Sequence, residues 1–367
     1  MTELVEIMII LNSFFDGNFK QEIKDRTTLL GQSRPMVSVY VNCYNHESYL
    51  RQALDSIISQ RIDFKMEVLV RDDCSTDNTR AIILEYEKKY PEIIIAFLEN
   101  ENLFSKKISD FASDILPLCR GRYLAVCEGD DYWLDNNKLT KQVRYLESNP
   151  DCILLYNNSV FVDQNNHKTQ DIYGIYSPKS EQDYTLDMFS LGYEFPGQTA
   201  SSIIRKSFYD DMSESMKKEY FQLRGNGDTK KIFGALLVGR VHIQSDFMSA
   251  YRIVTQDSDS WSARNFGRNG SADRLAMELD YKRYAKRFYS ISYKNNWKIF
   301  VSGMGCLVKA IYNPSAENRE VLKKGISEFT SIPHFLIMMF WFGLTGLFQK
   351  IAKPTVRLID MQSEDGC

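Results

Sequence analysis

The sequence has little of what several common classes of protein require. Its seven cysteines are odd in number, scattered and without a C-x-x-C pair, which favours reduced thiols and a cytosolic compartment over a disulfide framework. The formal net charge of −3 gives no global electrostatic reason to expect a nucleic-acid partner. Neither G-x-G-x-x-G nor G-x-x-x-x-G-K-[ST] occurs, so the usual glycine-rich cradles for dinucleotides and phosphates are excluded.

Long hydrophobic runs are also scarce. The first apolar stretch, in "MTELVEIMIILNSFF", follows acids rather than Lys or Arg and lacks a small-residue cleavage site, so no signal peptide is expected. Residues 335–348, "FLIMMFWFGLTGLF", are uncharged and are followed by Lys350, Lys353 and Arg357. Because this run is short for a membrane span, it predicts either a packed helix or a helix lying in a membrane interface.

From residue 36 onward, strand patterns alternate with helix patterns. Strands are predicted over residues 37–42, 66–71, 93–98 and 122–128, and helices over residues 49–60, 79–90, 107–119 and 136–147. Asp135 is expected to cap the last of these helices. The alternation predicts an α/β fold with a mostly parallel, doubly wound sheet, whose ligands gather beyond the carboxyl ends of its strands.

Three carboxylates stand at the carboxyl end of the fourth predicted strand. "CEGDDYW" places Glu128, Asp130 and Asp131 on one short loop, where their negative charges repel each other. Mg²⁺ and Mn²⁺ prefer such oxygen ligands and keep open positions for substrate phosphates. The loop therefore predicts a divalent metal site for a diphosphate. The alternative is a solvated turn in which Asp130 caps a helix.

Polar residues also follow the first two predicted strands. In "RDDCSTDNT", the pair Asp72 and Asp73 ends a strand, and Asp77 suits a turn that starts a helix. A carboxylate at a strand end can accept a hydrogen bond from the N3–H of a uracil-like base or bond a ribose. Asn42 follows the first strand, so it is expected to share one crevice with Asp72, Asp73 and the acidic loop.

Three segments in this order and spacing, "VSVYVNCYNHESYLRQALDSIISQ", "EVLVRDDCSTDNT" and "GRYLAVCEGDDYW", resemble a family 2 glycosyltransferase with the GT-A fold. The resemblance covers about residues 36–260. It implies sugar transfer from a nucleotide diphosphate donor, usually with inversion and with Mg²⁺ or Mn²⁺. It also implies roles for single residues: nucleoside contact for Asn42, Tyr44, Asp73 and Asp72, and metal and ribose contact for Asp130 and Asp131, with Glu128 in place of the usual first Asp.

An inverting transfer needs a general base that deprotonates the acceptor hydroxyl. In the family this base is an acid that starts a helix, and "GNGDTKKIFGALLVGRVHI" resembles that segment, which nominates Asp228. Asp228 is also a good helix N-cap in this context, and both roles are compatible.

The sequence departs from the family pattern at two places. Val254 in "YRIVTQD" stands where relatives carry a histidine, so either the metal has one ligand fewer or Tyr251 and Arg252 help instead. "ENENLFSKKI" lacks the usual glycine, although Lys106 and Lys107 remain candidates for diphosphate contact, or else form a solvated basic pair. His46 is expected to be a loop or helix-start residue rather than a metal ligand, and Trp261 is expected to border the acceptor site.

The sequence thus predicts an N-terminal extension (residues 1–34), a GT-A domain (35–260) and a helical C-terminal region (261–367). The expected activity is a metal-dependent inverting transfer from a UDP-sugar to a saccharide or polyprenyl-linked acceptor in polysaccharide biosynthesis. The expected location is the cytoplasm, at the inner face of the membrane. Two alternatives stay open: a nucleotidyltransferase, and a non-catalytic nucleotide-sugar-binding or scaffold subunit.

Overall fold

The structure, a computed structural model, describes residues 34–103, 115–169, 176–192, 194–253, 270–329 and 332–351, with only the backbone for 332 and 346–351. The predicted N-terminal extension lies almost wholly outside these residues. By its internal contacts the chain divides into two compact units. The first comprises residues 1–147, 199–207 and 247–252, and the second comprises residues 148–198, 208–246 and 253–367.

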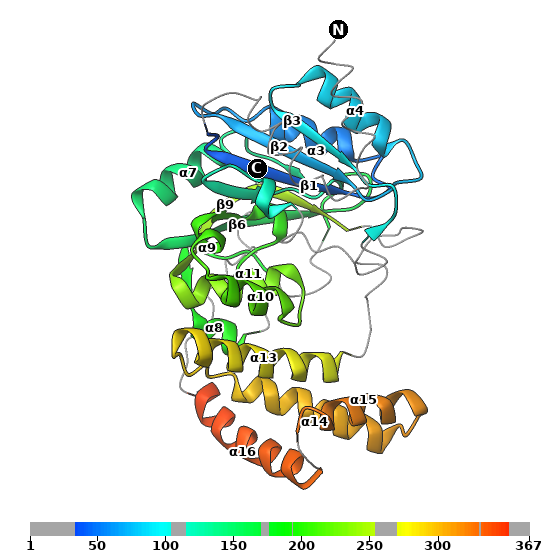
Figure 1. Cartoon of the computed structure of the whole chain (residues 1–367), viewed down its shortest axis with the longest axis vertical. Coiled ribbons are helices and arrows are strands. Elements are labelled where there is room, and N and C mark those ends of the chain that lie inside the picture. The colour runs from blue at the N-terminus through cyan, green and yellow to red at the C-terminus, as the bar shows by residue number, and fades with distance from the viewer. Residues whose placement is uncertain are drawn as a thin grey trace, which may run out of the picture. The chain divides into compact units, whose positions relative to one another are not determined.

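The elements of the described residues follow in chain order (Figure 1). The strands are β1 (Val37–Cys43), β2 (Met66–Asp72), β3 (Ile94–Leu98), β4 (Tyr123–Val126), β5 (Tyr132–Trp133), β6 (Cys152–Val162), β7 (Gln182–Tyr184), β8 (Ile203–Arg205) and β9 (Arg240–Arg252). The helices are α3 (Leu50–Ile58), α4 (Thr79–Lys89), η1 (Leu116–Leu118), α7 (Lys138–Ser148), α8 (Leu186–Leu191), η2 (Thr199–Ser201), α9 (Ser207–Asp210), α10 (Glu214–Gln222), α11 (Gly227–Val238), α13 (Ser271–Tyr289), α14 (Asn296–Tyr312), α15 (Ala316–Ile326) and α16 (Ile332–Ile351).

The first unit is built on parallel strands. The neighbours run in the order β3-β2-β1-β4-β8, in which β1 pairs in parallel with both β2 and β4, and β2 pairs in parallel with β3. β8 is antiparallel to β4, and β5 is antiparallel to the last residues of β9. β2 is buried along its whole length, as its β-branched and apolar run predicts for a strand covered on both faces.

Two helices of this unit show how local sequence fixes their position. α3 buries Leu50, Ala53, Leu54 and Ile57, the spacing of a single apolar face. In α7 the buried residues include Lys138, whose Nζ donates to Gln142 Oε1 over 2.8 Å and lies 4.4 Å from the centre of the Trp133 ring. The first unit therefore holds a buried lysine whose described partners are an amide and an aromatic face.

The second unit combines two strand pairings with a group of helices. β9 runs beside β6 and pairs antiparallel with β7. Helices α13, α14, α15 and α16 contact one another, as Figure 1 shows for the C-terminal end of the chain. Their apolar core is formed by Leu275, Leu279, Ile299, Phe335, Met339 and Phe342.

The predicted α/β fold with a helical C-terminal region is confirmed. Strands β3, β2, β1 and β4 form the predicted parallel sheet, whereas the pairings of β8 with β4, β5 with β9 and β7 with β9 are antiparallel. All four predicted strands are present, although the fourth ends at Val126 rather than at residue 128. Of the helix predicted over residues 107–119, the described part forms only the short η1, because Pro117 follows its first residue. Asp135 accepts the N–H of Asn137 over 2.7 Å, just before α7 begins. The predicted boundaries at residues 35 and 261 stay predictions.

Candidate active site

The carboxyl ends of β1, β2 and β4 meet at one edge of the parallel sheet. The main-chain carbonyl of Cys43 accepts the N–H of Asp73 over 2.9 Å, and that of Asn42 accepts the N–H of Gly129 over 3.0 Å. The loops after the three strands are thus tied to one another by main-chain hydrogen bonds. The sequence prediction that these polar segments come together is confirmed.

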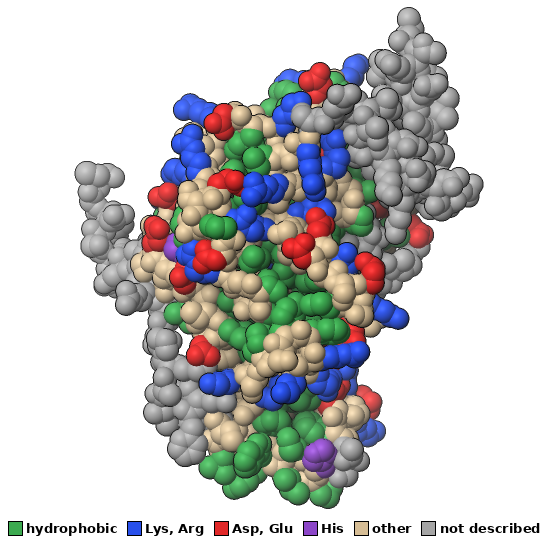
Figure 2. Space-filling view, turned by 60° about the vertical axis from the view of Figure 1, so that its left-hand side comes forward, with side chains coloured by type: hydrophobic (Ala, Val, Ile, Leu, Met, Phe, Trp, Pro, Cys, Tyr) green, Lys and Arg blue, Asp and Glu red, His purple; other side chains and the backbone are tan. Residues whose placement is uncertain are grey.

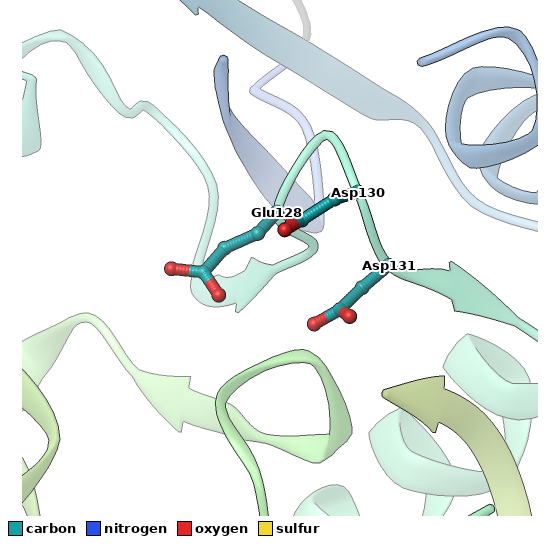
Figure 3. Close-up of side chains that lie close together, drawn as sticks. All are labelled: Glu128, Asp130 and Asp131. Carbon is teal, nitrogen blue, oxygen red and sulfur yellow. The ribbon is translucent and has the colours of Figure 1, made fainter. Parts of the chain in front are cut away.

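Glu128, Asp130 and Asp131 form a cluster on the loop between β4 and β5 (Figure 3). One carboxylate oxygen of each residue lies within 4.8 Å of those of the other two. Asp131 is 1% exposed, whereas Glu128 and Asp130 are partly exposed. Because Asp131 is buried, the solvated turn of the alternative interpretation does not describe this residue.

The tight turn of this acidic loop depends on Gly129. A Cβ atom at this position would lie 2.7 Å from Nδ1 of His46 and 2.8 Å from Sγ of Cys43. Distances this short are well inside ordinary van der Waals contact, so only glycine lets the loop approach the end of β1. The His46 ring also places Nε2 3.8 Å from Oδ2 of Asp130, which makes His46 a neighbour of the cluster. His46 lies in the turn before α3, and its main-chain carbonyl accepts the N–H of Leu50, the first residue of that helix, over 2.9 Å.

Arg252, the last residue of β9, reaches the same loop. Its main-chain N–H donates to Oδ1 of Asp131 over 2.9 Å, and its Nε donates to the carbonyl of Asp130 over 2.8 Å. Its Nη2 donates to Oε1 of Gln52 over 2.9 Å. The sequence nominated Arg252 only as a help at the metal, and nothing in the sequence pointed to Gln52.

Aromatic rings enclose the guanidinium of Arg252. Its Cζ lies 4.5 Å from the ring centre of Tyr49 and 5.5 Å from that of Tyr132, and the residue is 2% exposed. A buried cation costs free energy unless nearby negative charge offsets it. The described partners of this cation are the main-chain carbonyl of Asp130, the amide oxygen of Gln52 and the two aromatic faces, so it is held on the loop that carries the acidic cluster.

The predicted nucleoside residues divide into two groups. Asp72 and Asp73 are buried, and their carboxylates already have partners in the protein. Asp72 accepts from Nε of Arg80 over 3.1 Å and from the N–H of Ser75, which shapes the turn into α4. Asp73 accepts the N–H of Leu103 over 2.9 Å.

Asn42 and Tyr44, by contrast, are only partly buried at the end of β1. Their position leaves them accessible to a ligand at this edge of the sheet. The predicted positions Lys106, Lys107, Val254 and Trp261 lie outside the described residues.

Asp228 belongs to the second unit and lies in the first turn of α11. The cap of this helix is Asn226, whose Oδ1 accepts the N–H of Thr229 over 2.8 Å. The expectation that Asp228 is the N-cap is therefore wrong, because the chain enters the helix two residues earlier. Asp228 instead pairs with Nζ of Lys231, 3.0 Å away and one helical turn on.

A buried tyrosine adjoins this ion pair. Nζ of Lys231 lies 5.8 Å from the ring centre of Tyr156, which is fully buried. Burial, and then the negative charge of Asp228, raise the pKa of the Tyr156 phenol well above its ordinary value. Tyr156 therefore stays neutral beside Asp228 at physiological pH.

Within the described residues, no helix combines the length and the apolar character needed to cross a bilayer.

Comparisons with known proteins agree with this geometry. The model of glycosyl transferase family 2 matches residues 38–212. An uncharacterized protein of Mycobacterium tuberculosis is 33% identical over 250 residues, which cover 66% of this chain and 68% of that protein. The chondroitin synthase of Escherichia coli is 33% identical over 98 residues, covering 27% of this chain and 13% of the synthase.

The fold is also shared with a solved structure. The crystal structure of residues 1–349 of S. aureus TarS in complex with UDP-GlcNAc superposes with a TM-score of 0.54 at 15% identity, covering 85% of this chain and 88% of that one. The fold is thus the GT-A fold. With the family match, it establishes that the chain belongs to glycosyl transferase family 2 and is a glycosyltransferase. The nucleotidyltransferase and non-catalytic alternatives are set aside.

Proposed function

We propose that the protein transfers a sugar from a nucleotide diphosphate donor, with a UDP-sugar as the first choice, to a saccharide or polyprenyl-linked acceptor in polysaccharide biosynthesis. The observation that carries this proposal is the cluster of Glu128, Asp130 and Asp131 at the carboxyl edge of the parallel strands. In open α/β sheets this edge is where nucleotide ligands bind. TarS, which shares the fold, binds UDP-GlcNAc, and chondroitin synthase is named for a polysaccharide.

The cluster fits a hard divalent cation, Mg²⁺ or Mn²⁺. Its donors are carboxylate oxygens gathered on one loop, the ligand type that these ions prefer. Asp131 and Asp130 are the proposed principal ligands, with Glu128 as a further one. When bound, the ion neutralises the negative charge that develops on the departing diphosphate.

The residues around the cluster are proposed to hold the nucleotide. Asn42 and Tyr44 are accessible at the end of β1, where a base or ribose can contact them. Asp73 and Asp72 are proposed to contribute mainly by shaping the loops, because Leu103, Ser75 and Arg80 already occupy their carboxylates. Lys107 stays a proposed contact for the diphosphate.

The transfer is proposed to be a single displacement with inversion. The acceptor oxygen forms a bond to the anomeric carbon, the bond from that carbon to the diphosphate oxygen breaks, and the nucleoside diphosphate leaves. The acceptor proton passes to a carboxylate oxygen of Asp228. Lys231 orients this carboxylate, and Asn226 caps the helix that carries it.

The proposed test measures release of the nucleoside diphosphate from UDP-, GDP- and dTDP-sugars with Mn²⁺. We expect one UDP-sugar to be turned over. Asp131→Asn should raise the Mn²⁺ concentration needed for half-maximal activity. Asp228→Asn should lower kcat by roughly 10²–10⁴-fold, which is the usual contribution of a general base, while donor affinity stays close to that of the wild type.

A matched control exists on another helix. Glu214 lies in the first turn of α10 and pairs with Lys217 at 3.3 Å, as Asp228 pairs with Lys231. Glu214→Gln removes the same kind of ion pair and should leave kcat unchanged. Full turnover by Asp228→Asn would show that this acid is only structural.

A further inference from the structure

The proposed general base, Asp228, follows an exposed connection between two helices. α10 ends at Gln222 and α11 begins at Gly227, and residues 224–227 are exposed. Exposed connections are mobile unless contacts hold them, whereas a general base must be placed closely to act. The contacts of this connection therefore decide how well Asp228 is positioned.

An ion-pair network ties the connection to the C-terminal helices. Nε of Arg224 lies 3.1 Å from Oδ2 of Asp280 in α13, and Nη1 of Arg224 donates to Oε1 of Glu328, two residues after α15. Arg283 of α13 pairs with the same two carboxylates. These four residues form the Arg224 network. Its acids are only 16% and 14% exposed, so solvent screens them less than it screens an isolated surface pair.

A glycine lets the connection lie directly against α13. Gly225 has a φ of +113°, which strains any side chain, and a Cβ atom there would lie 2.8 Å from Sδ of Met277 and 2.9 Å from Oη of Tyr281. The Tyr281 ring stacks in turn on that of Phe233 in α11, with 4.2 Å between the ring centres and 12° between the planes. α13 thus holds both the connection and the helix that carries Asp228, as the packing of α13 against α10 and α11 in Figure 1 illustrates.

Position distinguishes the Arg224 network from an ordinary surface ion pair. In the lower part of Figure 2, Lys and Arg side chains lie close to Asp and Glu side chains around the C-terminal helices. Most exposed pairs of this kind contribute little. One of them joins Arg287 of α13 to Glu219 of α10 over 2.6 Å, but Glu219 lies within a helix. Arg224, by contrast, lies in the connection, four residues before Asp228.

We propose that Arg224 and Gly225 are positioning residues for the general base, because they fix the start of α11 against α13. The role assigned to the C-terminal helices is support of Asp228, not contact with the donor or the acceptor. Placement of Asp228 matters for turnover only if Asp228 is the base, so the inference rests on the proposed function. It goes further because α13 and α15 lie beyond residues 38–212, the part of the chain that the family model matches.

Steady-state UDP release by the full chain, with the UDP-sugar that is turned over fastest in the donor screen, tests the catalytic part. Arg224→Met keeps the apolar stem but loses both ion pairs. We expect its kcat to fall about tenfold while the donor KM stays close to that of the wild type, because only the base is displaced. Arg224→Lys can pair with one carboxylate at a time and should fall less. Gly225→Ala should show the same split between kcat and KM as Arg224→Met.

Amide hydrogen exchange supplies a readout that needs no activity. The N–H groups of Thr229 and Lys230 donate to the side chain and the main chain of Asn226 in the first turn of α11. Their exchange should become roughly fivefold faster in Arg224→Met, because the start of the helix opens more often. Arg287→Met is the matched control: it removes an Arg–carboxylate pair from the same α13 and should keep the wild-type exchange and kcat.

Two results for Arg224→Met would overturn the proposal. One is unchanged exchange, which would mean that the network does not hold the start of α11. The other is faster exchange with unchanged kcat, which would leave the network a purely structural role. An equal fall of kcat in Arg287→Met would also contradict it, because any loosening of α13 would then suffice. Failure of the proposed function is separate, since it appears as full turnover by Asp228→Asn.

Discussion

The main-chain N–H of Arg252 donates to Oδ1 of Asp131 over 2.9 Å, across 121 positions of the sequence. The guanidinium of the same residue holds the carbonyl of Asp130 and the amide oxygen of Gln52. The acidic loop is thus fixed by the end of a strand from a distant part of the chain. Arg252 acts on the cluster in two ways, by position and by charge.

The charge of Arg252 should matter most when no divalent ion is present. Arg252→Met keeps much of the apolar stem but removes the cation, so the three carboxylates repel one another and two acceptors lose their donor. We expect the free energy of unfolding without metal to fall by about 2–4 kcal/mol. Millimolar Mn²⁺ should restore more stability to the variant than it adds to the wild type, as urea unfolding with and without Mn²⁺ would measure.

Gln52→Ala is the control for this prediction, because it removes a neutral partner of the same guanidinium. It should cost about 1 kcal/mol, with no dependence on Mn²⁺ beyond that of the wild type. An Arg252→Met variant whose loss is equally independent of Mn²⁺ would mean that Arg252 acts by packing alone.

Gly129 should be intolerant of any side chain. In Gly129→Ala the new methyl group meets His46 and Cys43 at 2.7 and 2.8 Å, so the loop must move away from the end of β1. We expect turnover to fall at least about tenfold, because misplaced ligands and positioning groups are costly in catalysis. Steady-state kinetics would measure this. In Gly270→Ala the methyl group meets nothing within 4 Å, so this variant should keep wild-type kinetics.

At the start of α11, helix stability and catalysis are predicted to depend on two different residues. Asn226→Ala removes the cap of the helix and should lower the free energy of unfolding by about 1 kcal/mol. Asp228→Asn keeps a polar group in the first turn and should change stability much less. Thermal unfolding of both variants, set beside their kcat values, would show whether stability and turnover follow different residues. A stability loss in Asp228→Asn equal to that in Asn226→Ala would contradict this division.

Local patterns were enough to predict part of this site. β-branched runs marked the strands, and the rule that parallel strands end at one edge brought Asn42, Asp73 and the acidic loop together. Local sequence patterns could not identify the partners of that loop, because Gln52 and Arg252 contact it only in the tertiary structure. At α11 the sequence analysis assigned the cap to Asp228, and only the structure showed that Asn226, two residues earlier, is the cap.

Lys138 predicts a pH dependence of stability. Burial lowers the pKa of its ammonium group to about 7, although the Trp133 ring, which favours the charged form, opposes this. In the unfolded chain the group keeps its proton up to about pH 10.4. Between about pH 7 and about pH 10.4 the unfolded state binds more protons than the folded state, so the free energy of unfolding rises with pH. Below about pH 7 Lys138 is protonated in both states, and the folded state carries the full cost of the buried charge.

Lys138→Met should abolish this dependence. From pH 6 to pH 9 the wild type should gain roughly 2 kcal/mol of stability relative to the variant, measured by urea unfolding at both values. Lys218→Met replaces an exposed lysine of α10 and should show no such change. A constant difference between the wild type and Lys138→Met at the two pH values would mean that the buried amine does not titrate in this range.

Helix α16 has one buried face and one exposed apolar face, and this has a practical consequence for producing the protein. Ending the chain before Ile332 would improve solubility at first sight, because it removes the exposed apolar stripe of the helix. This stripe consists of Leu336, Ile337, Phe340, Trp341 and Leu344. The same cut would withdraw Phe335 and Met339 from the core and uncover Leu275 and Ile299. The truncation would replace one exposed apolar surface with another and would also destabilise the helical region. Polar substitutions confined to the stripe are the better route to a soluble, intact enzyme.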